Sequence, residues 1–425
     1  MTSSKSGNRT IQGATAAVSQ PAIVNANGFT LKPSQTVKSV SSMTLAPDGK
    51  LIVADWKNNA LHAITLPETS ATESGSFNLY GVDSAIAQAL DTDRQQIRVT
   101  KSIFEPTTNK AVLAVETGAQ PEDPVVIAVF GSNGEGTLHN LDELVAATLS
   151  LGDVPPEASL WEHTPARSFL VTAMKAHDGE IFVAGLANSD FSSTLRRVAY
   201  PFNGTTATTP VEIYHAVHNQ IETRAPIRAF SIVDIAGAPH VLAAYTCTPL
   251  VTLPIADLKD GAHIQGKTIA ELGYGNTPLD VVPFDVSYQG ETSQWVMIAN
   301  SSRAADLISF DAIIAANNEA GLSQPVQAPF ETRSGVPAMQ APITNAVCLV
   351  DQDEQFLLSL RRDPTEGDLQ LVSIRKGAFF RLSDFVNEYD FPNYSYPEED
   401  EFQQNYIRPF HQMMKTDEGY QELVK

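Results

Sequence analysis

The chain has 425 residues, of which 43% are hydrophobic, and its 28 lysines and arginines stand against 49 aspartates and glutamates, a formal net charge of −21. This hydrophobic fraction provides a substantial core and argues against a disordered chain. The acidic balance argues against nucleic acid and anionic membranes as partners, because both bind clustered basic residues. No apolar run approaches the roughly 18 residues that a membrane-spanning helix needs, so we expect no membrane insertion.

The N-terminal segment, residues 1–37, begins with a polar stretch rich in Ser, Thr, Ala and Gly. Residues 1–20 lack the apolar stretch of roughly 7–15 residues that marks a signal peptide. Two localisations stay open: a cytoplasmic protein, or an exported bacterial protein whose signal peptide has been removed. Low lysine content and only two cysteines favour the periplasmic or secreted alternative. We expect residues 1–37 to be partly disordered or to close a unit of the repeat that follows.

The clearest strand pattern lies between residues 42 and 66. Its Asp48-Gly49 pair, flanked by β-prone runs, is a strong signal for a β-hairpin turn. An apolar strand begins at Leu51, and an alternating strand follows the polar turn Trp56-Lys-Asn-Asn59. This segment therefore predicts three consecutive antiparallel strands.

The same pattern recurs along the chain, each time as an apolar strand and a second strand joined by a polar turn. The further units lie at 105–130, 175–202, 233–258, 287–313 and 350–374. The central apolar strands begin near residues 51, 111, 181, 240, 295 and 356, which gives a repeat of roughly 60 residues. Segments at 76–80, 211–214 and 268–272 supply further strands, and we assign the first of them to the first unit.

Four short antiparallel strands per unit, repeated at a fixed period, are typical of an all-β fold, the β-propeller. The stretch Pro47-Asp-Gly-Lys-Leu-Ile-Val-Ala-Asp-Trp-Lys-Asn-Asn59 resembles blades of the six-bladed NHL-type propellers. We therefore predict a β-propeller over residues 38–380 with six blades. Seven blades remain the alternative, with the additional blade in residues 9–37 or after 380. Helical patterns at 85–90 and 141–151 are expected as insertions between blades.

The C-terminal segment, residues 381–425, changes character and is acidic and aromatic, with the run Glu398-Glu-Asp-Glu401. A purely solvating tail would carry few aromatic residues. We interpret this segment as an acidic C-terminal arm that packs on the flank of the propeller or on a partner. One of the functions left open, a propeller subunit of a larger redox complex, would use this arm for docking.

Polar residues leave the second strand of each unit toward the face where loops gather and function concentrates. They are Asp55, Glu116, Asn188, Thr246, Asn300 and Arg361. Carboxylate and amide oxygens are ligands of Ca²⁺. Six-bladed lactonase-type hydrolases hold a divalent metal with Glu, Asn and Asp at the channel mouth, and resemblance to them implies a Ca²⁺ site at Asp55, Glu116, Asn188 and Asn300. The alternative is that these residues merely begin turns.

Arginines form a second candidate set on the same face. The predicted ligand-binding residues are Arg98, Arg167, Arg228, Arg303 and Arg361. Guanidinium groups bind carboxylates and phosphates in bidentate fashion, and convergent cations around a funnel concentrate anions. The set predicts an anionic small molecule or an acidic segment of a protein partner as ligand. The alternative is that each arginine pairs with a nearby acid and braces neighbouring blades.

The remaining chemistry-bearing residues give weaker signals. His215 and His218 have an i,i+3 spacing that suits a helix, but the segment reads as a strand, so we expect no metal site there; Glu212 would be the third ligand if one existed. Cys247 and Cys348 are expected to be buried in apolar strands. Gly-x-Ser-x-Gly and phosphate-loop motifs are absent. The functions left open are therefore a binding propeller, a metal-dependent lactonase-like hydrolase or lyase, and the redox-complex subunit.

Overall fold

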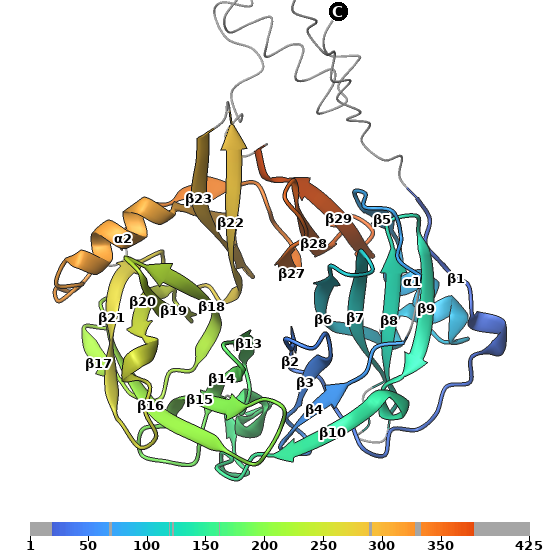
Figure 1. The fold of residues 1–425 in the computed structure, drawn as a ribbon, viewed down its shortest axis with the longest axis horizontal. Coiled ribbons are helices and arrows are strands. Elements are labelled where there is room, and N and C mark those ends of the chain that lie inside the picture. Colours follow the sequence, from blue (N-terminus) through green and yellow to red (C-terminus); the bar gives the residue numbers. More distant parts are fainter. Residues whose placement is uncertain are drawn as a thin grey trace, which may run out of the picture. The chain divides into compact units, whose positions relative to one another are not determined.

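The structure, a computed structural model, describes residues 19–67, 70–118, 120, 123–160, 162–288, 291–327 and 333–377. The described part is nearly all β, with two short α-helices, α1 (Val82–Ala89) and α2 (Phe310–Asn318). Its strands are arranged around a common axis (Figure 1). No helix in these ranges has the length and apolar character to cross a membrane.

Short strands from different parts of the chain surround the axis. These innermost strands are β2 (Ser42–Leu45), β6 (Ile97–Glu105), β13 (Ala173–His177), β18 (Ile227–Ile235), β22 (Pro278–Tyr288) and β27 (Ala346–Asp351). Each contacts the next in the order β2, β13, β18, β22, β27, β6, and β6 contacts β2, so the series closes on itself. This closed, radial series is the arrangement of a β-propeller, and it confirms the all-β, propeller-like prediction.

The second strands are β3 (Leu51–Asp55), β7 (Lys110–Thr117), β14 (Glu180–Leu186), β19 (Ala238–Tyr245), β23 (Glu291–Asn300) and β28 (Phe356–Arg362). Each pairs antiparallel with its innermost strand. They are the apolar runs of the sequence repeat, and both of their faces are covered. Each of the main hydrophobic clusters packs side chains from two adjoining groups of strands.

Outer strands extend these pairs. They are β4 (Ala60–Ile64), β8 (Val125–Gly131), β9 (Glu135–Asn140), β15 (Ser193–Ala199), β16 (Thr206–His215), β20 (Pro249–Pro254), β21 (Ile264–Glu271), β24 (Ala305–Ser309), β26 (Met339–Ala341) and β29 (Leu369–Arg375). β16 pairs parallel with β21 and thereby merges two groups into one ten-stranded sheet. Shorter strands are β11 (Ser159–Leu160), β12 (Thr164–Pro165), β17 (Gln220–Glu222) and β25 (Ser334–Gly335). Because of the merged sheet, the number of sheets is not the number of blades.

Two groups of strands are completed by segments from elsewhere in the chain. β5 (Asn78–Tyr80) pairs with β29, almost 300 residues later, and β10 (Val145–Ser150) returns to pair with β4. The assignment of 76–80 to the first unit is therefore wrong. The expected helix over 141–151 is also wrong: it is a 3₁₀ turn at 141–144 followed by β10, where the β-branched Val145 and Thr148 favour a strand. The helix expected at 85–90 is confirmed as α1.

The described part of the N-terminal segment forms β1 (Ala22–Ile23) and a 3₁₀ turn at Ala26–Gly28. β1 pairs parallel with β9 and extends the edge of that sheet. The boundaries predicted for the N-terminal segment, the propeller and the C-terminal arm stay predictions. Residues 381–425, and with them the proposed docking arm, lie outside the described residues.

Candidate functional site

Irregular pairing marks the start of four innermost strands. The register against the second strand shifts at Val99/Lys101, Ile227/Ala229, Pro278/Asp280 and Ala346/Cys348. Each of these four strands contains one extra residue, which has no partner in the second strand, at this point. Such β-bulges redirect side chains and are frequent beside functional sites. The repeat therefore places non-ideal backbone at one level of the ring, close to where each strand begins.

A lysine and an aspartate meet across the ring immediately after two of these bulges. Lys101 of β6 and Asp280 of β22 are 3.8 Å apart, Nζ to Oδ1, with about a fifth of each side chain exposed (22% and 23%). The second carboxylate oxygen of Asp280 accepts a hydrogen bond from the Leu349 amide at 2.9 Å. Burial acts to lower the pKa of Lys101, but the charges of Asp280 and Cys348 outweigh it, so this pKa lies above its usual value.

Two further cations face the same region from other strands. Lys175 of β13 and Arg228 of β18 are both half-buried, and neither has an ion pair within the described ranges. Burial lowers the pKa of Lys175, the positive charge of Lys101 lowers it further, and Asp280 offsets this only in part. Burial also lowers the pKa of Arg228, whose charge in turn lowers that of Lys101. Electrostatic effects therefore connect Lys101 with Lys175, Arg228 and Asp280, which come from four innermost strands.

The guanidinium of Arg228 is held by stacking. Its Cζ lies 5.1 Å from the centre of the Phe169 ring, and its buried Nε has no hydrogen-bond partner among the described residues. Arg228 is itself the extra residue of the β18 bulge, between Ile227 and Ala229. An aromatic face positions a guanidinium through cation–π contact without neutralising its charge.

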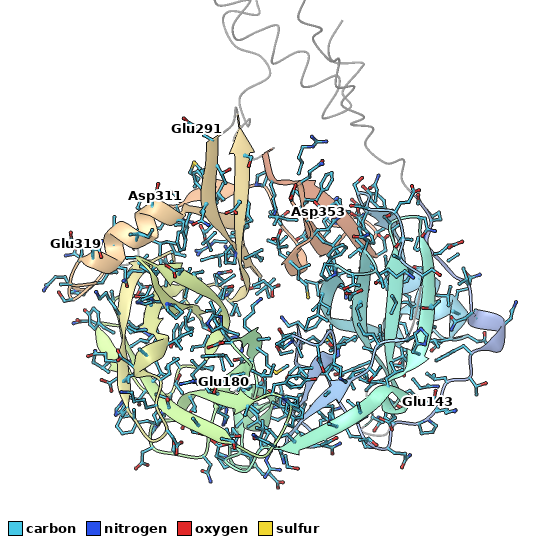
Figure 2. All side chains as sticks on the ribbon, in the orientation of Figure 1. Glu143, Glu180, Glu291, Asp311, Glu319 and Asp353 are labelled. Carbon is cyan, nitrogen blue, oxygen red and sulfur yellow. The ribbon has the colours of Figure 1, made fainter. Side chains whose placement is uncertain are left out.

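We call Lys101, Lys175, Arg228 and Asp280 the axial cluster. Three cations and one carboxylate give it a formal charge of 3 − 1 = +2, within a chain of net charge −21. Acidic side chains such as Glu143, Glu291 and Glu319 lie instead at the periphery of the described part (Figure 2). Convergent cations in a partly enclosed region attract anions.

Of the predicted ligand-binding arginines, four have local partners in the structure. Arg98 pairs with Glu116, Arg167 with Glu157 at 3.0 Å, and Arg303 with Asp306 at 3.4 Å. Arg361 donates to the side chain of Gln370 at 3.1 Å. Three of the four partners are nearby acids, as the alternative expected, whereas Arg361 contacts an amide, and bracing between blades stays a prediction. Arg228 alone of the five belongs to the axial cluster, and ligand binding by the set stays a prediction.

The predicted metal ligands also have partners close to them. Asp55, fully buried, accepts hydrogen bonds from the Lys38 amide at 2.8 Å and the Ser39 hydroxyl at 2.6 Å. Glu116 accepts one from the Val40 amide at 3.1 Å. These two carboxylates therefore fix the segment that leads into β2.

The two amides of the predicted metal set lie in different surroundings. Asn300 is buried and donates to Asp306 at 3.0 Å, whereas Asn188 is exposed. Within the described ranges, no hydrogen bond or ion pair links one of the four residues to another. The Ca²⁺ site stays a prediction.

Comparison with known proteins gives only distant similarities. No family model matches the chain, and no curated protein matches it. Among solved structures, extracellular domains 1–2 of Drosophila Semaphorin 1a align at 8% identity and a TM-score of 0.34, covering 81% of this chain and 87% of that one. The PQQ-bound form of an aldose sugar dehydrogenase from Streptomyces coelicolor aligns at 10% identity and a TM-score of 0.30, covering 81% and 99%. At these scores the alignments carry no argument, and the propeller assignment rests on the strand arrangement itself.

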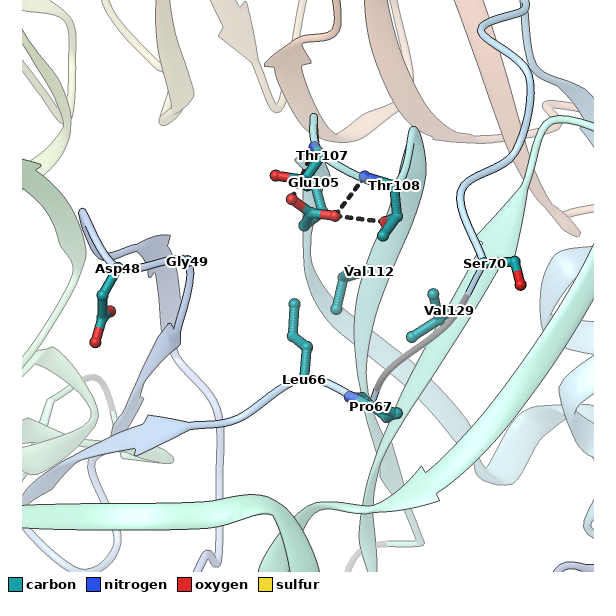
Figure 3. Close-up of a pocket in the computed structure, with 10 residues that line it drawn as sticks. All are labelled: Asp48, Gly49, Leu66, Pro67, Ser70, Glu105, Thr107, Thr108, Val112 and Val129. Carbon is teal, nitrogen blue, oxygen red and sulfur yellow. Dashed lines mark hydrogen bonds between the residues drawn. The ribbon is translucent and has the colours of Figure 1, made fainter.

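A cavity of about 690 Å³ lies off the axis, between the β2–β3 turn and the strands β7 and β8 (Figure 3). Its buried carboxylate, Glu105, accepts hydrogen bonds from the Thr108 hydroxyl and from the amides of Thr107 at 2.9 Å and Thr108 at 2.8 Å. Burial acts to raise the pKa of Glu105, but these hydrogen bonds outweigh it, so this pKa lies below its usual value. At its edge, Asp48 pairs with Lys50 and accepts a hydrogen bond from Tyr200, whose pKa burial and Asp48 raise to about 12. Both carboxylates thus accept hydrogen bonds within the turns that they stabilise, Glu105 after β6 and Asp48 between β2 and β3.

The sequence predicted only Arg228 of the axial cluster as a site residue. Lys101, Lys175 and Asp280 were not predicted, because the candidates were chosen mainly at the ends of second strands. Lys101 and Lys175 lie within innermost strands, where an isolated lysine looks like an ordinary solvent-facing position. The available signal was their context: Thr-Lys-Ser-Ile-Phe and Met-Lys-Ala-His each place one lysine in a strand directly before a largely apolar second strand. Asp280 carries the same signal with the opposite charge.

Proposed function

We propose that this chain is a β-propeller binding protein whose axis receives an anion, either a small molecule or an acidic segment of a partner. The supporting observation is the axial cluster, in which Lys175 and Arg228 have no ion pair among the described residues. Withdrawing cations from water without a counter-charge costs free energy, and an anion bound among them offsets that cost.

The side chains of the cluster favour particular chemistry. The Arg228 guanidinium presents a planar fork that fits two oxygens of one carboxylate or phosphate, whereas the lysines act as point charges. A formal cluster charge of +2 is balanced by two negative charges. The ligand class we propose is therefore a small di-acid or phosphate, with an acidic peptide segment as the larger alternative.

The number of blades and the resemblance to NHL-type blades belong to the same proposal. We take each innermost strand with its second and outer strands as one blade, which gives six blades and assigns the two halves of the merged sheet to separate blades. The resemblance of Pro47–Asn59 to NHL-type blades supports this count. An exported, periplasmic or secreted, location suits a receptor for a dissolved anion.

Calorimetric titration with inorganic phosphate and with citrate at low ionic strength tests the proposal. Arg228→Gln keeps a polar side chain of similar length but loses the charge and the fork. Hydrogen bonds to charged groups contribute about 1.5–3 kcal/mol, so affinity should fall at least about 10-fold. Arg167→Gln is the matched control, because Arg167 already pairs with Glu157, and it should leave affinity unchanged.

Two results would contradict the proposal. One is that neither anion binds the intact chain at low salt. The other is that Arg228→Gln and Arg167→Gln change affinity equally, which would place the bound anion on the general surface. Circular dichroism of both variants establishes that the comparison is made between folded proteins.

A further inference from the structure

A second cluster of reactive side chains lies away from the axis, where β16 ends. His215 is the last residue of β16, and the tight turn through Asn219 (φ 51°) carries His218 back onto it. The ring centroids of the two histidines are 3.9 Å apart. The expectation that strand geometry separates them is wrong, because the strand ends between them.

Cys247 approaches the two histidines from the turn between β19 and β20. It is half-buried and free, with a left-handed backbone (φ 65°), and so is not the buried strand residue that its sequence suggested. One ligand atom from each of His215, His218 and Cys247 lies within 4.8 Å of the other two. Among the described residues, no other set of three histidine, cysteine, aspartate or glutamate side chains converges this closely. These three residues are therefore the candidate ligands of a metal ion.

Buried polar atoms at this point lack partners. His215 is 2% exposed; its Nδ1 lies 3.0 Å from Glu222, but its Nε2 completes no hydrogen bond with a described residue. Glu271, fully buried, has one carboxylate oxygen 4.0 Å from His215 Nε2, while its other oxygen is unpartnered. Buried polar groups in native proteins normally find a partner. Two neighbouring buried atoms, His215 Nε2 and one Glu271 oxygen, therefore lack partners at a point that favours a cation.

A carboxylate also holds both imidazoles. Glu222 of β17 lies 2.6 Å from His218 Nδ1 and 3.0 Å from His215 Nδ1. Metal-bound histidines characteristically have a carboxylate on the ring nitrogen that does not bind the ion, and this contact orients the ring. The position of Glu222 fits that role.

We propose that His215, His218 and Cys247 bind one Zn²⁺ ion. Imidazole nitrogen and thiolate sulfur are preferred zinc ligands, and three protein ligands leave a fourth position for water or substrate. That position reaches solvent, since 44% of the His218 side chain is exposed. Binding deprotonates the Cys247 thiol and releases its proton to solvent.

Metal titration of the full chain after chelator treatment tests the proposal. Zn²⁺ should bind with one ion per chain, and Co²⁺ in its place should give a thiolate-to-cobalt charge-transfer band. Cys247→Ser should abolish the band, and Glu222→Gln should weaken Zn²⁺ binding about 10- to 100-fold. His263→Gln is the matched control, because His263 pairs with Glu212 at 3.1 Å outside the cluster, and it should bind as the unaltered chain does.

Alkylation of the unaltered protein gives a second readout that needs no variant. Cys247 is half-buried and Cys348 is buried, so iodoacetamide should label Cys247 first, and Zn²⁺ should slow that labelling selectively. Labelling of Cys247 at the same rate with and without Zn²⁺ would overturn the proposal. Unchanged Zn²⁺ affinity in folded Cys247→Ser would overturn it as well. If the variants fail to fold, the labelling rates of the unaltered chain decide.

Discussion

At the scale of single residues, the axial cluster joins groups whose charges are incompletely balanced. Lys101 has Asp280 within 3.8 Å, whereas Lys175 has only the more distant influence of that carboxylate. The two lysines therefore shift in opposite directions: the pKa of Lys101 is raised and that of Lys175 is lowered. Of the two lysines, Lys175 therefore loses its proton more readily as pH rises. A bound anion would stabilise the protonated amine and raise this pKa.

The lowered pKa of Lys175 predicts how anion binding depends on pH. The protonated amine attracts the anion, so affinity is complete below the pKa of Lys175 and falls as pH rises through it. This fall should begin below the value of about 10.4 typical of lysine. Phosphate affinity measured by calorimetry between neutral pH and pH about 10 should show the decline.

Lys175→Met isolates the contribution of that amine. The variant should bind phosphate more weakly at neutral pH and should lose most of the alkaline decline. A decline of the same size in Lys175→Met would show that another group causes it. A flat profile in the unaltered chain would contradict the position that we assign to Lys175.

At the scale of secondary-structure elements, the sequence repeat predicted the strands but not all of their partners. Apolar runs such as those beginning at Leu51, Ile181 and Phe356 are the second strands, because only a strand covered on both faces is apolar throughout. The partner of Asn78–Tyr80 could not be predicted, because three residues contain no information about a strand almost 300 positions away. The axial lysines were missed for a similar reason: their neighbours come from other strands.

The pairing of β5 with β29 predicts that a buried residue of β5 contributes to the free energy of unfolding. Leu79 is fully buried within the cluster that also contains Leu371 of β29. Leu79→Ala should lower the free energy of unfolding by roughly 2–5 kcal/mol, the usual cost of a cavity at a buried leucine. Urea denaturation followed by circular dichroism measures this loss.

Leu149→Ala in β10 is the matched comparison, since Leu149 is only half-buried. Its loss should be clearly smaller than that of Leu79→Ala. Equal losses of unfolding free energy in the two variants, or no loss in Leu79→Ala, would mean that β5 does not stabilise the group of strands that it completes.

At the scale of the described body, closure of the ring of innermost strands assembles the axial cluster. The innermost strands contact one another in a closed series, and this series brings cations from β6, β13 and β18 together although they are far apart in sequence. Of the acidic groups labelled in Figure 2, Asp311 lies on the outer helix α2 and Glu319 directly after it. A closed ring is therefore the condition for the binding function that we propose, because an open arrangement of the same strands would separate the cluster.

Diffraction from crystals soaked in bromide tests the central claim most directly, because anomalous scattering locates the anion without assumptions about its natural counterpart. We predict a bromide peak at the axis in contact with Lys175 and Arg228. Bromide bound only at the outer surface, with none beside these two side chains, would contradict an anion site at the axis.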